Sequence, residues 1–205
     1  MTESEILFEK LLLSKNISFQ KIPESTTPTP DYKVTIGGRE SYWEVKELKE
    51  NPDEEGILKN IKNDCNDIYS INSKRVSNSI QSAAKQFKKY GVTNSPCVVV
   101  LHDSRGFATM DFLLLQYIKT AMLGTASFIE NTDGTALEIN RKDGLFTKRK
   151  KYISAIAVIS RGSKDILFLH NSNTSHPVLR KWLLPIFTTH YQAVIDAQSL
   201  QWVKA

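Results

Sequence analysis

Two acids and a lysine lie at a spacing that suits metal-dependent chemistry. Asp31 is in one extended segment, Glu44 and Lys46 are in the next, and Gly37-Gly38 separates the two. If the glycines form a two-residue turn, the segments pair as an antiparallel hairpin with Asp31 directly across from Glu44. Opposed residues have Cβ atoms about 4.5–5.5 Å apart on one side of a sheet, and strand alternation adds Lys46 to that side. This prediction depends on the turn length, because a different turn would shift the register.

Opposed carboxylates repel each other unless something compensates their charge. A divalent cation between Asp31 and Glu44 would do so. The alternative is an ion cluster in a solvated hairpin, where Lys46 neutralises one acid. The other side of the hairpin is apolar, with Trp43 and Val45 among its residues, and is predicted to meet the core.

The elements around the hairpin indicate one α/β domain over residues 1–205, with a mixed central β-sheet flanked by helices. Residues 51–56 are predicted to be an acidic loop, and the tail from Pro177 onward has no clear periodicity. The apolar run CVVVL is typical of a strand covered on both faces. Periodicity and turn residues predict helices at 4–15, 57–70, 77–90 and 111–124, and strands at 31–36, 41–48, 96–102, 127–140, 153–160 and 166–170.

The sequence P30-D31 followed by E44-V45-K46 resembles the PD-(D/E)XK nuclease superfamily, which has the restriction-endonuclease-like fold. The preceding helix, Glu5-x-x-Phe8-x-x-x-Leu12, with its KNISF exit, is similar to the opening of archaeal Holliday-junction resolvases. Gln86-x-x-x-Tyr90 is similar to an element of some branches, although it lies further from Lys46 than is usual there. The resemblance covers roughly residues 3–102.

The resemblance implies a divalent-metal-dependent phosphodiesterase, an endonuclease acting on nucleic acid and preferably on DNA. It assigns Asp31, Glu44 and the carbonyl of Val45 to Mg²⁺, for which Mn²⁺ could substitute. Lys46 would orient the nucleophile and stabilise the developing negative charge. Glu5 would complete the metal-ligand set or orient a water. The open alternatives are RNA as the substrate, and a catalytically silent nucleic-acid-binding or interaction module with the same fold.

The role of Glu5 has a competing explanation. Thr2-x-x-Glu5 is also a capping box, in which both side chains satisfy free backbone amides at a helix start. Glu9, one helical turn further along, is the substitute acid if Glu5 is only a cap.

The net charge of +5, from 27 Lys and Arg against 22 Asp and Glu in 205 residues, is concentrated in two basic segments, 74–89 and 141–151. Segregated basic segments are typical of proteins that bind a phosphate backbone, although solvated faces are the alternative. The second segment lies within 104–152, a possible elaboration of the core. Specificity for a particular nucleic-acid sequence would come from loops, a homodimer or a partner protein. The residues predicted to contact nucleic acid are Lys85, Gln86, Lys88, Lys89, Arg149 and Lys150.

The remaining composition excludes several classes of protein. Its apolar share of 40% and charged share of 24% are close to those of soluble globular domains, which excludes disorder, collagen and small disulfide scaffolds. The longest apolar stretch, residues 112–129, is interrupted by polar residues and is too short to span a membrane. The N-terminus does not resemble a signal peptide. With only Cys65 and Cys97, the sequence predicts a reduced, cytoplasmic protein.

Overall fold

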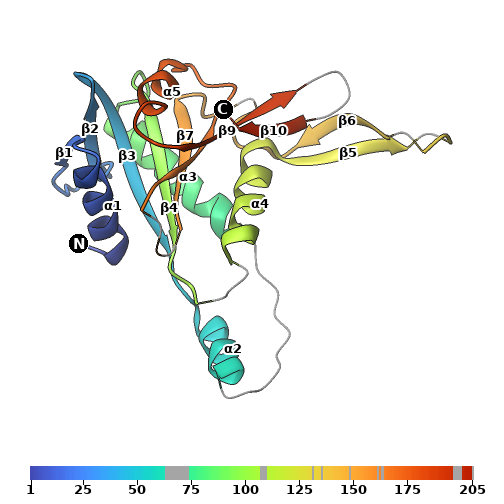
Figure 1. Cartoon of the computed structure of the whole chain (residues 1–205), viewed down its shortest axis with the longest axis horizontal. Helices are drawn as coiled ribbons and strands as arrows, with labels where there is room; N and C mark the ends of the chain where they lie inside the picture. Colours follow the sequence, from blue (N-terminus) through green and yellow to red (C-terminus); the bar gives the residue numbers. More distant parts are fainter. Residues whose placement is uncertain are drawn as a thin grey trace.

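An eight-stranded mixed sheet forms the centre of the molecule (Figure 1), with the order β1-β2-β3-β4-β7-β8-β9-β10. The computed structural model describes residues 1–62, 74–106, 110–130, 132–134, 136–147, 149–160, 162, 164–195 and 200–204. The strands β3, β4 and β7 run parallel, and so do β8 and β9, whereas the other neighbours are antiparallel. This arrangement confirms the predicted α/β class with a mixed sheet flanked by helices. Within the described ranges, none of the helices has the length and apolar content that a bilayer crossing requires.

The helices and strands follow one another along the chain with the sheet interrupted once by a separate hairpin. The helices are α1 (Glu3–Ser14), α2 (Pro52–Lys62), α3 (Lys74–Tyr90), α4 (Met110–Leu123) and α5 (Val178–Leu183). The strands are β1 (Ser18–Lys21), β2 (Tyr32–Ile36), β3 (Arg39–Leu48), β4 (Cys97–Asp103), β5 (Thr125–Glu130), β6 (Ala136–Lys142), β7 (Ile153–Ile159), β8 (Leu167–His170), β9 (Thr189–Ile195) and β10 (Leu200–Lys204).

Two hydrophobic cores lie on opposite faces of the sheet. On one face, α1 and α5 cover β2, β3, β4, β7 and β8, with Phe8, Trp43 and Phe168 fully buried. On the other face, α3 and α4 pack against β4 and β7 through residues such as Phe87 and Ile118. Because both faces are covered, every residue of β4 and β7 is buried, which the apolar run CVVVL predicted for β4.

The hairpin β2–β3 has the predicted register. Tyr32 pairs with Trp43 and Ile36 with Arg39, and both turn glycines have positive φ, 56° for Gly37 and 75° for Gly38. Two residues with positive φ form the tight turn whose twist matches that of the strands. The alternation that depends on this register therefore holds along β3.

The prediction of an acidic loop at 51–56 is wrong, because α2 begins at Pro52. Asn51 accepts a hydrogen bond from the backbone N–H of Glu54 (2.8 Å), and the Glu54 carboxylate accepts one from Asn51 N–H (2.9 Å). Proline at the first helical position and acids in the first turn favour this start. The predicted helix at 57–70 lies within the described residues only as far as Lys62, and Cys65 lies outside them.

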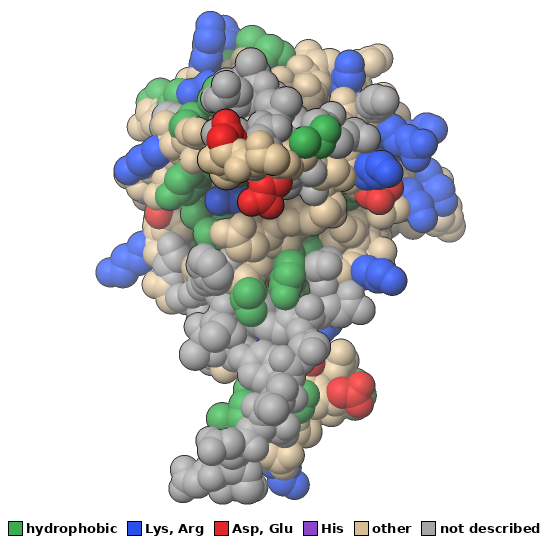
Figure 2. Space-filling view, turned by 90° about the vertical axis from the view of Figure 1, so that its right-hand side faces the viewer, with side chains coloured by type: hydrophobic (Ala, Val, Ile, Leu, Met, Phe, Trp, Pro, Cys, Tyr) green, Lys and Arg blue, Asp and Glu red, His purple; other side chains and the backbone are tan. Residues whose placement is uncertain are grey.

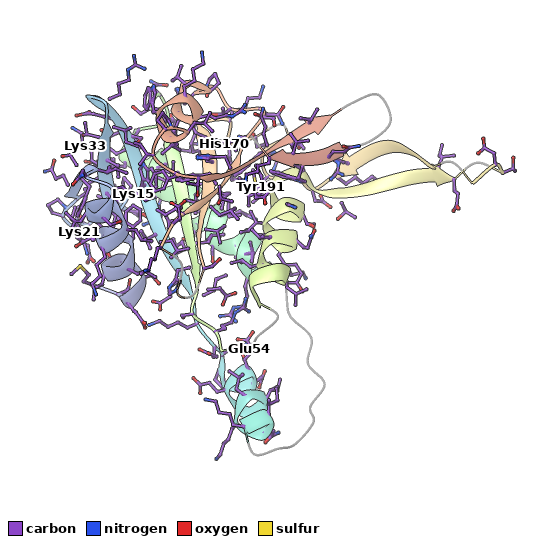
Figure 3. The ribbon with its side chains drawn as sticks, viewed as in Figure 1. Lys15, Lys21, Lys33, Glu54, His170 and Tyr191 are labelled. Carbon is purple, nitrogen blue, oxygen red and sulfur yellow. The ribbon has the colours of Figure 1, made fainter. Side chains whose placement is uncertain are left out.

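The start of α2 is tied to the body by an ion-pair network. Glu54, labelled in Figure 3, contacts Arg75 of α3 at 2.6 Å and the buried Arg105 at 3.1 Å. Arg105 also contacts Asp103 at the end of β4. Arg75 is therefore engaged inside the protein, although it belongs to the first basic segment.

The predicted strand region 127–140 forms a hairpin of its own, β5–β6, outside the main sheet. It projects from the body in Figure 1, and Figure 2 views the molecule from that side, with Lys and Arg side chains around the margin and α2 protruding below. The tail left unassigned from the sequence supplies α5, β9 and β10. The last two strands complete the edge of the central sheet.

Candidate functional site

The two predicted carboxylates, Asp31 and Glu44, meet at the open end of the β2–β3 hairpin. Asp31 immediately precedes β2, where its backbone N–H donates to Glu44 Oε2 at 3.1 Å. In return, Asp31 Oδ2 accepts from the backbone N–H of Val45 at 2.8 Å. The hydrogen bonds hold the two acids together in the arrangement that the register predicted.

Lys46 joins the acids from the same side of β3. Its ammonium lies 2.5 Å from Glu44 Oε1 and donates to Gln86 Oε1 of α3 at 2.8 Å. The Gln86 amide in turn donates to the backbone carbonyl of Thr29 at 3.1 Å. We call Asp31, Glu44, Lys46 and Gln86 the carboxylate site. Gln86 thus connects α3 both to β3 and to the segment that leads into β2.

The structure changes the setting that the sequence suggested for these residues. The ion pair between Lys46 and Glu44 exists, as in the alternative reading of the motif, but the hairpin face is not solvated. The side chain of Glu44 is 1% exposed, and that of Lys46 is 25% exposed. The polar face is covered because α3 packs across it, so the ionised groups lie in a poorly solvated environment.

Burial, and next the nearby charge of Asp31, raise the pKa of Glu44 to about 7, and Lys46 opposes the shift. Burial also raises the pKa of Asp31 above its ordinary value, and the hydrogen bond from Val45 N–H opposes that rise. Both acids are therefore harder to ionise than free carboxyl groups. An added positive charge at the site would relieve this strain.

Asp31 opens onto a cavity of about 200 Å³ beside the carboxylate site. Gln86, Thr29 and Lys21 also line this cavity. Asp31 Oδ2 is engaged by Val45, whereas no partner within the described residues engages Oδ1. The cavity therefore gives a small ligand access to one of the two acids.

Glu5 lies in the capping box that the sequence allowed. Thr2 N–H donates to Glu5 Oε2 at 2.5 Å, and the Thr2 hydroxyl accepts from Glu5 N–H at 3.2 Å. Glu5 Oε1 pairs with Lys21 of β1 at 2.8 Å, and Lys21 lies at the sheet edge in Figure 3. The substitute acid, Glu9, accepts a hydrogen bond from the Tyr32 hydroxyl at 2.9 Å. Neither glutamate contacts Asp31 or Glu44 directly.

The metal ligands that the sequence predicted come together only in part. Among the described residues, no group of three or more His, Cys, Asp or Glu side chains is arranged to hold a metal ion. Asp31 and Glu44 remain as a pair of oxygen donors, with the backbone of Val45 beside them. Their chemistry suits a hard cation such as Mg²⁺, which prefers one or two carboxylates and keeps several waters.

The two basic segments meet in space although about 50 residues separate them in sequence. Lys85 and Lys88 of α3 line one groove with Arg149 and Lys150, together with Tyr152. This basic groove has a volume of about 520 Å³ and has no Asp or Glu in its described lining. Burial, and then the charges of Arg149 and Lys85, lower the pKa of Lys150, which shows that the cations repel one another.

Helix α3 connects the basic groove with the carboxylate site. Its core stripe, which includes Ile80 and Phe87, faces the sheet. Gln86 lies on the flank toward β3, whereas Lys85 and Lys88 lie toward Tyr152, whose hydroxyl donates to the backbone carbonyl of Ala84 at 3.0 Å. Lys89 is exposed and does not line the groove, so the structure does not group it with the other predicted contacts.

Sequence reasoning missed Lys21, Thr29 and Tyr152 as neighbours of these sites. Lys21 and Tyr152 had no motif to mark them, and Thr29 contributes its backbone carbonyl, which no residue type encodes. The length of the Pro- and Thr-rich segment before Asp31 was the one available signal, because a segment next to a paired acid must pass close to the site.

Comparisons of the chain with models of protein families, with curated proteins and with solved structures find no match. The resemblance to the PD-(D/E)XK nucleases therefore stays a prediction carried by the motif residues.

Proposed function

We propose that the protein is a divalent-metal-dependent phosphodiesterase that cleaves nucleic acid internally, with DNA as the preferred substrate. One observation carries the proposal: buried Glu44 faces Asp31 at the end of a hairpin, and Lys46 lies beside both. Buried ionisable groups with raised pKa values in a confined site are typical of functional sites.

The donor set fits a hard divalent cation. Asp31 and Glu44, with the carbonyl of Val45, would hold Mg²⁺ or Mn²⁺ through oxygen atoms. A cation between the acids would offset the repulsion that raises the pKa of Glu44. When bound, the ion supplies an acidic water as the nucleophile and offsets negative charge on the phosphate.

Lys46 is suited to act on the phosphate or on the attacking water. An ammonium has three N–H donors, and Glu44 and Gln86 take two of those of Lys46. Among the described residues the third has no partner, so it is available to a phosphate oxygen, where a fixed positive charge stabilises negative charge as it develops. Gln86, anchored to the Thr29 carbonyl, holds the ammonium in position.

The basic groove supports nucleic acid as the substrate. Lys85, Lys88, Arg149 and Lys150 come from both basic segments and line one surface without an acid among the described lining residues. Such a surface attracts a phosphate backbone and gains affinity by releasing counterions. Gln86 and Lys85 are adjacent on α3. A nucleic-acid strand in the groove would therefore lie next to the helix whose Gln86 contacts Lys46.

The test is incubation of the full chain with supercoiled plasmid, linear duplex, single-stranded DNA, a four-way junction and RNA, each with Mg²⁺, with Mn²⁺ or with EDTA. We expect cleavage only with metal, and on DNA before RNA. Gel analysis of the products separates nicking, linearisation and junction resolution.

Variants of the carboxylate site provide the decisive comparison. Glu44→Gln and Lys46→Met should each lower the cleavage rate at least a hundredfold, as loss of charge stabilisation in a transition state does. Glu40→Gln is the matched control, because Glu40 lies on the same strand with its side chain 51% exposed. Full activity in purified, folded Glu44→Gln would refute the proposal. Binding that persists in EDTA without products in either metal would instead support the silent nucleic-acid-binding module.

A further inference from the structure

A further cavity lies where the end of β8 meets α5 and β9. It has a volume of about 350 Å³, which is within the range of small-molecule sites, and it shares no residue with the carboxylate site or the basic groove. Figure 3 shows His170, one of its lining residues, at the end of β8 near α5. Two cations, Arg180 and Lys181, line the cavity, and its described lining contains no Asp or Glu.

Arg180 brings a fixed positive charge to the wall of this cavity. Its Nη1 donates to Gln192 Oε1 of β9, which fixes the guanidinium against the sheet. Its Nε atom is buried and has no hydrogen-bond partner among the described residues. Because Nε is closed off from the cavity, an anionic ligand there would be favoured by the positive charge of the guanidinium as a whole.

A chain of histidines determines what His170 offers to the cavity. The Phe187 carbonyl can only accept, so His190 Nε2, at 2.8 Å, carries a proton. In neutral His190 the other nitrogen, Nδ1, must therefore accept a hydrogen bond from His170 Nε2–H, which lies 2.9 Å away. Burial, and then the charge of His190 and of Arg180, lower the pKa of His170 to about 3, so this ring is neutral as well. Its Nδ1 is left as an acceptor.

These groups specify a ligand that carries both an anion and a hydrogen-bond donor. Arg180 and Lys181 suit an oxyanion, whereas His170 Nδ1 requires an O–H or N–H. A carboxylate or sulfate alone would satisfy only the first requirement. A phosphorylated sugar satisfies both, because its phosphate has several acceptor oxygens and its ring has hydroxyl groups.

We propose that this cavity binds a small phosphomonoester bearing sugar hydroxyls, such as a nucleoside monophosphate, with the phosphate on Arg180 and Lys181 and a hydroxyl on His170 Nδ1. The same chemistry is present at the 5′-phosphorylated end of an oligonucleotide. This proposal does not depend on the proposed cleavage, because its test measures ligand binding without turnover.

Isothermal titration calorimetry of the full chain in EDTA tests the proposal, with AMP, ribose 5-phosphate, methyl phosphate and adenosine as probes. We expect AMP and ribose 5-phosphate to bind at least tenfold more tightly than adenosine, which lacks the phosphate, and than methyl phosphate, which lacks the hydroxyls. A 5′-phosphorylated dinucleotide and its 5′-hydroxyl counterpart distinguish the two sources of the ligand. Binding of the phosphorylated dinucleotide alone would assign the cavity to a nucleic-acid end.

Two substitutions locate the binding. Arg180→Gln should lower the affinity for AMP at least tenfold, since hydrogen bonds to charged groups are stronger than those between neutral groups. Lys181→Gln alters an exposed side chain, so it keeps the test valid if Arg180→Gln fails to fold. It should lower the affinity for AMP several-fold. Lys10→Gln, an exposed lysine on α1, is the charge-matched control and should leave the affinity unchanged.

Two results would overturn the proposal. One is the absence of binding by every phosphorylated probe at concentrations up to about 1 mM, the weak end of specific affinity. The other is AMP binding that is lost in Lys88→Gln but kept in both Arg180→Gln and Lys181→Gln. That pattern would place the nucleotide in the basic groove.

Discussion

The raised pKa of Glu44 predicts an unusual dependence of stability on pH. In the unfolded chain this carboxyl has its ordinary pKa of 4.5, and in the folded protein burial and the charge of Asp31 raise it to about 7. The folded state therefore binds the proton more tightly. The stabilisation that comes from the protonated Glu44 carboxyl is fully present below pH 4.5 and is lost as the pH rises through about 7. Across this pH window the free energy of unfolding should fall by up to about 3 kcal/mol.

Replacing Glu44 with glutamine removes the ionisation while it keeps the shape of the side chain. Without divalent metal, Glu44→Gln should be more stable than the wild-type chain at pH 8, by about 1–3 kcal/mol. Lost pairing with Lys46 accounts for the lower end of that range. Near pH 4.5 the two proteins should be close in stability, because Glu44 is then protonated in the folded state.

Urea unfolding in EDTA at several pH values between about 4.5 and 8 measures this difference, with the fluorescence of fully buried Trp43 contributing to the signal. Glu40→Gln is the control and should change the stability by less than about 0.5 kcal/mol, because Glu40 is an exposed partner of Lys33. A Glu44→Gln protein that is less stable than the wild type at pH 8 would refute the reasoning. So would a difference that does not vary with pH.

The same assay measures metal binding without turnover. At ten times its dissociation constant, a ligand that binds only the folded state adds about 1.4 kcal/mol to the free energy of unfolding. Mg²⁺ or Mn²⁺ should therefore stabilise the wild-type chain at pH 8 and leave Glu44→Gln nearly unchanged. Equal stabilisation of both proteins would show that the ion binds elsewhere.

Three further predictions follow from other parts of the molecule. Thr2→Ala removes the helix cap of α1 and should lower the free energy of unfolding in urea by about 1 kcal/mol. In fluorescence anisotropy titrations with duplex DNA, the double variant Lys85→Gln, Arg149→Gln should reduce the slope of log K against log salt by about 2, since each lost phosphate contact contributes about 0.9. An alanine Cβ at Gly124 would lie 2.0 Å from a backbone carbonyl oxygen of β6, so Gly124→Ala should lower the melting temperature more than Gly134→Ala, where φ is also positive but the space is open.

Local patterns were sufficient where neighbouring residues decide the conformation. Two glycines with positive φ specify the tight turn, and alternation of apolar residues then determines the register that brings Asp31 to Glu44. The start of α2 was missed because Asn51-Pro52-Asp53 has the composition of a loop and also that of a helix N-terminus. Local composition does not distinguish the two, whereas the contacts of Glu54 with Arg75 and Arg105 favour the helix.

The sequence by itself determined that two acids and a lysine share one side of a hairpin, because strand geometry repeats every two residues. Only the tertiary structure decided that α3 covers that side, which buries Glu44, raises its pKa and brings Gln86 to Lys46. It also joined two distant basic segments into the basic groove. The physical reason is that burial and long-range packing depend on how whole elements dock, and the period of a single strand or helix does not contain that information.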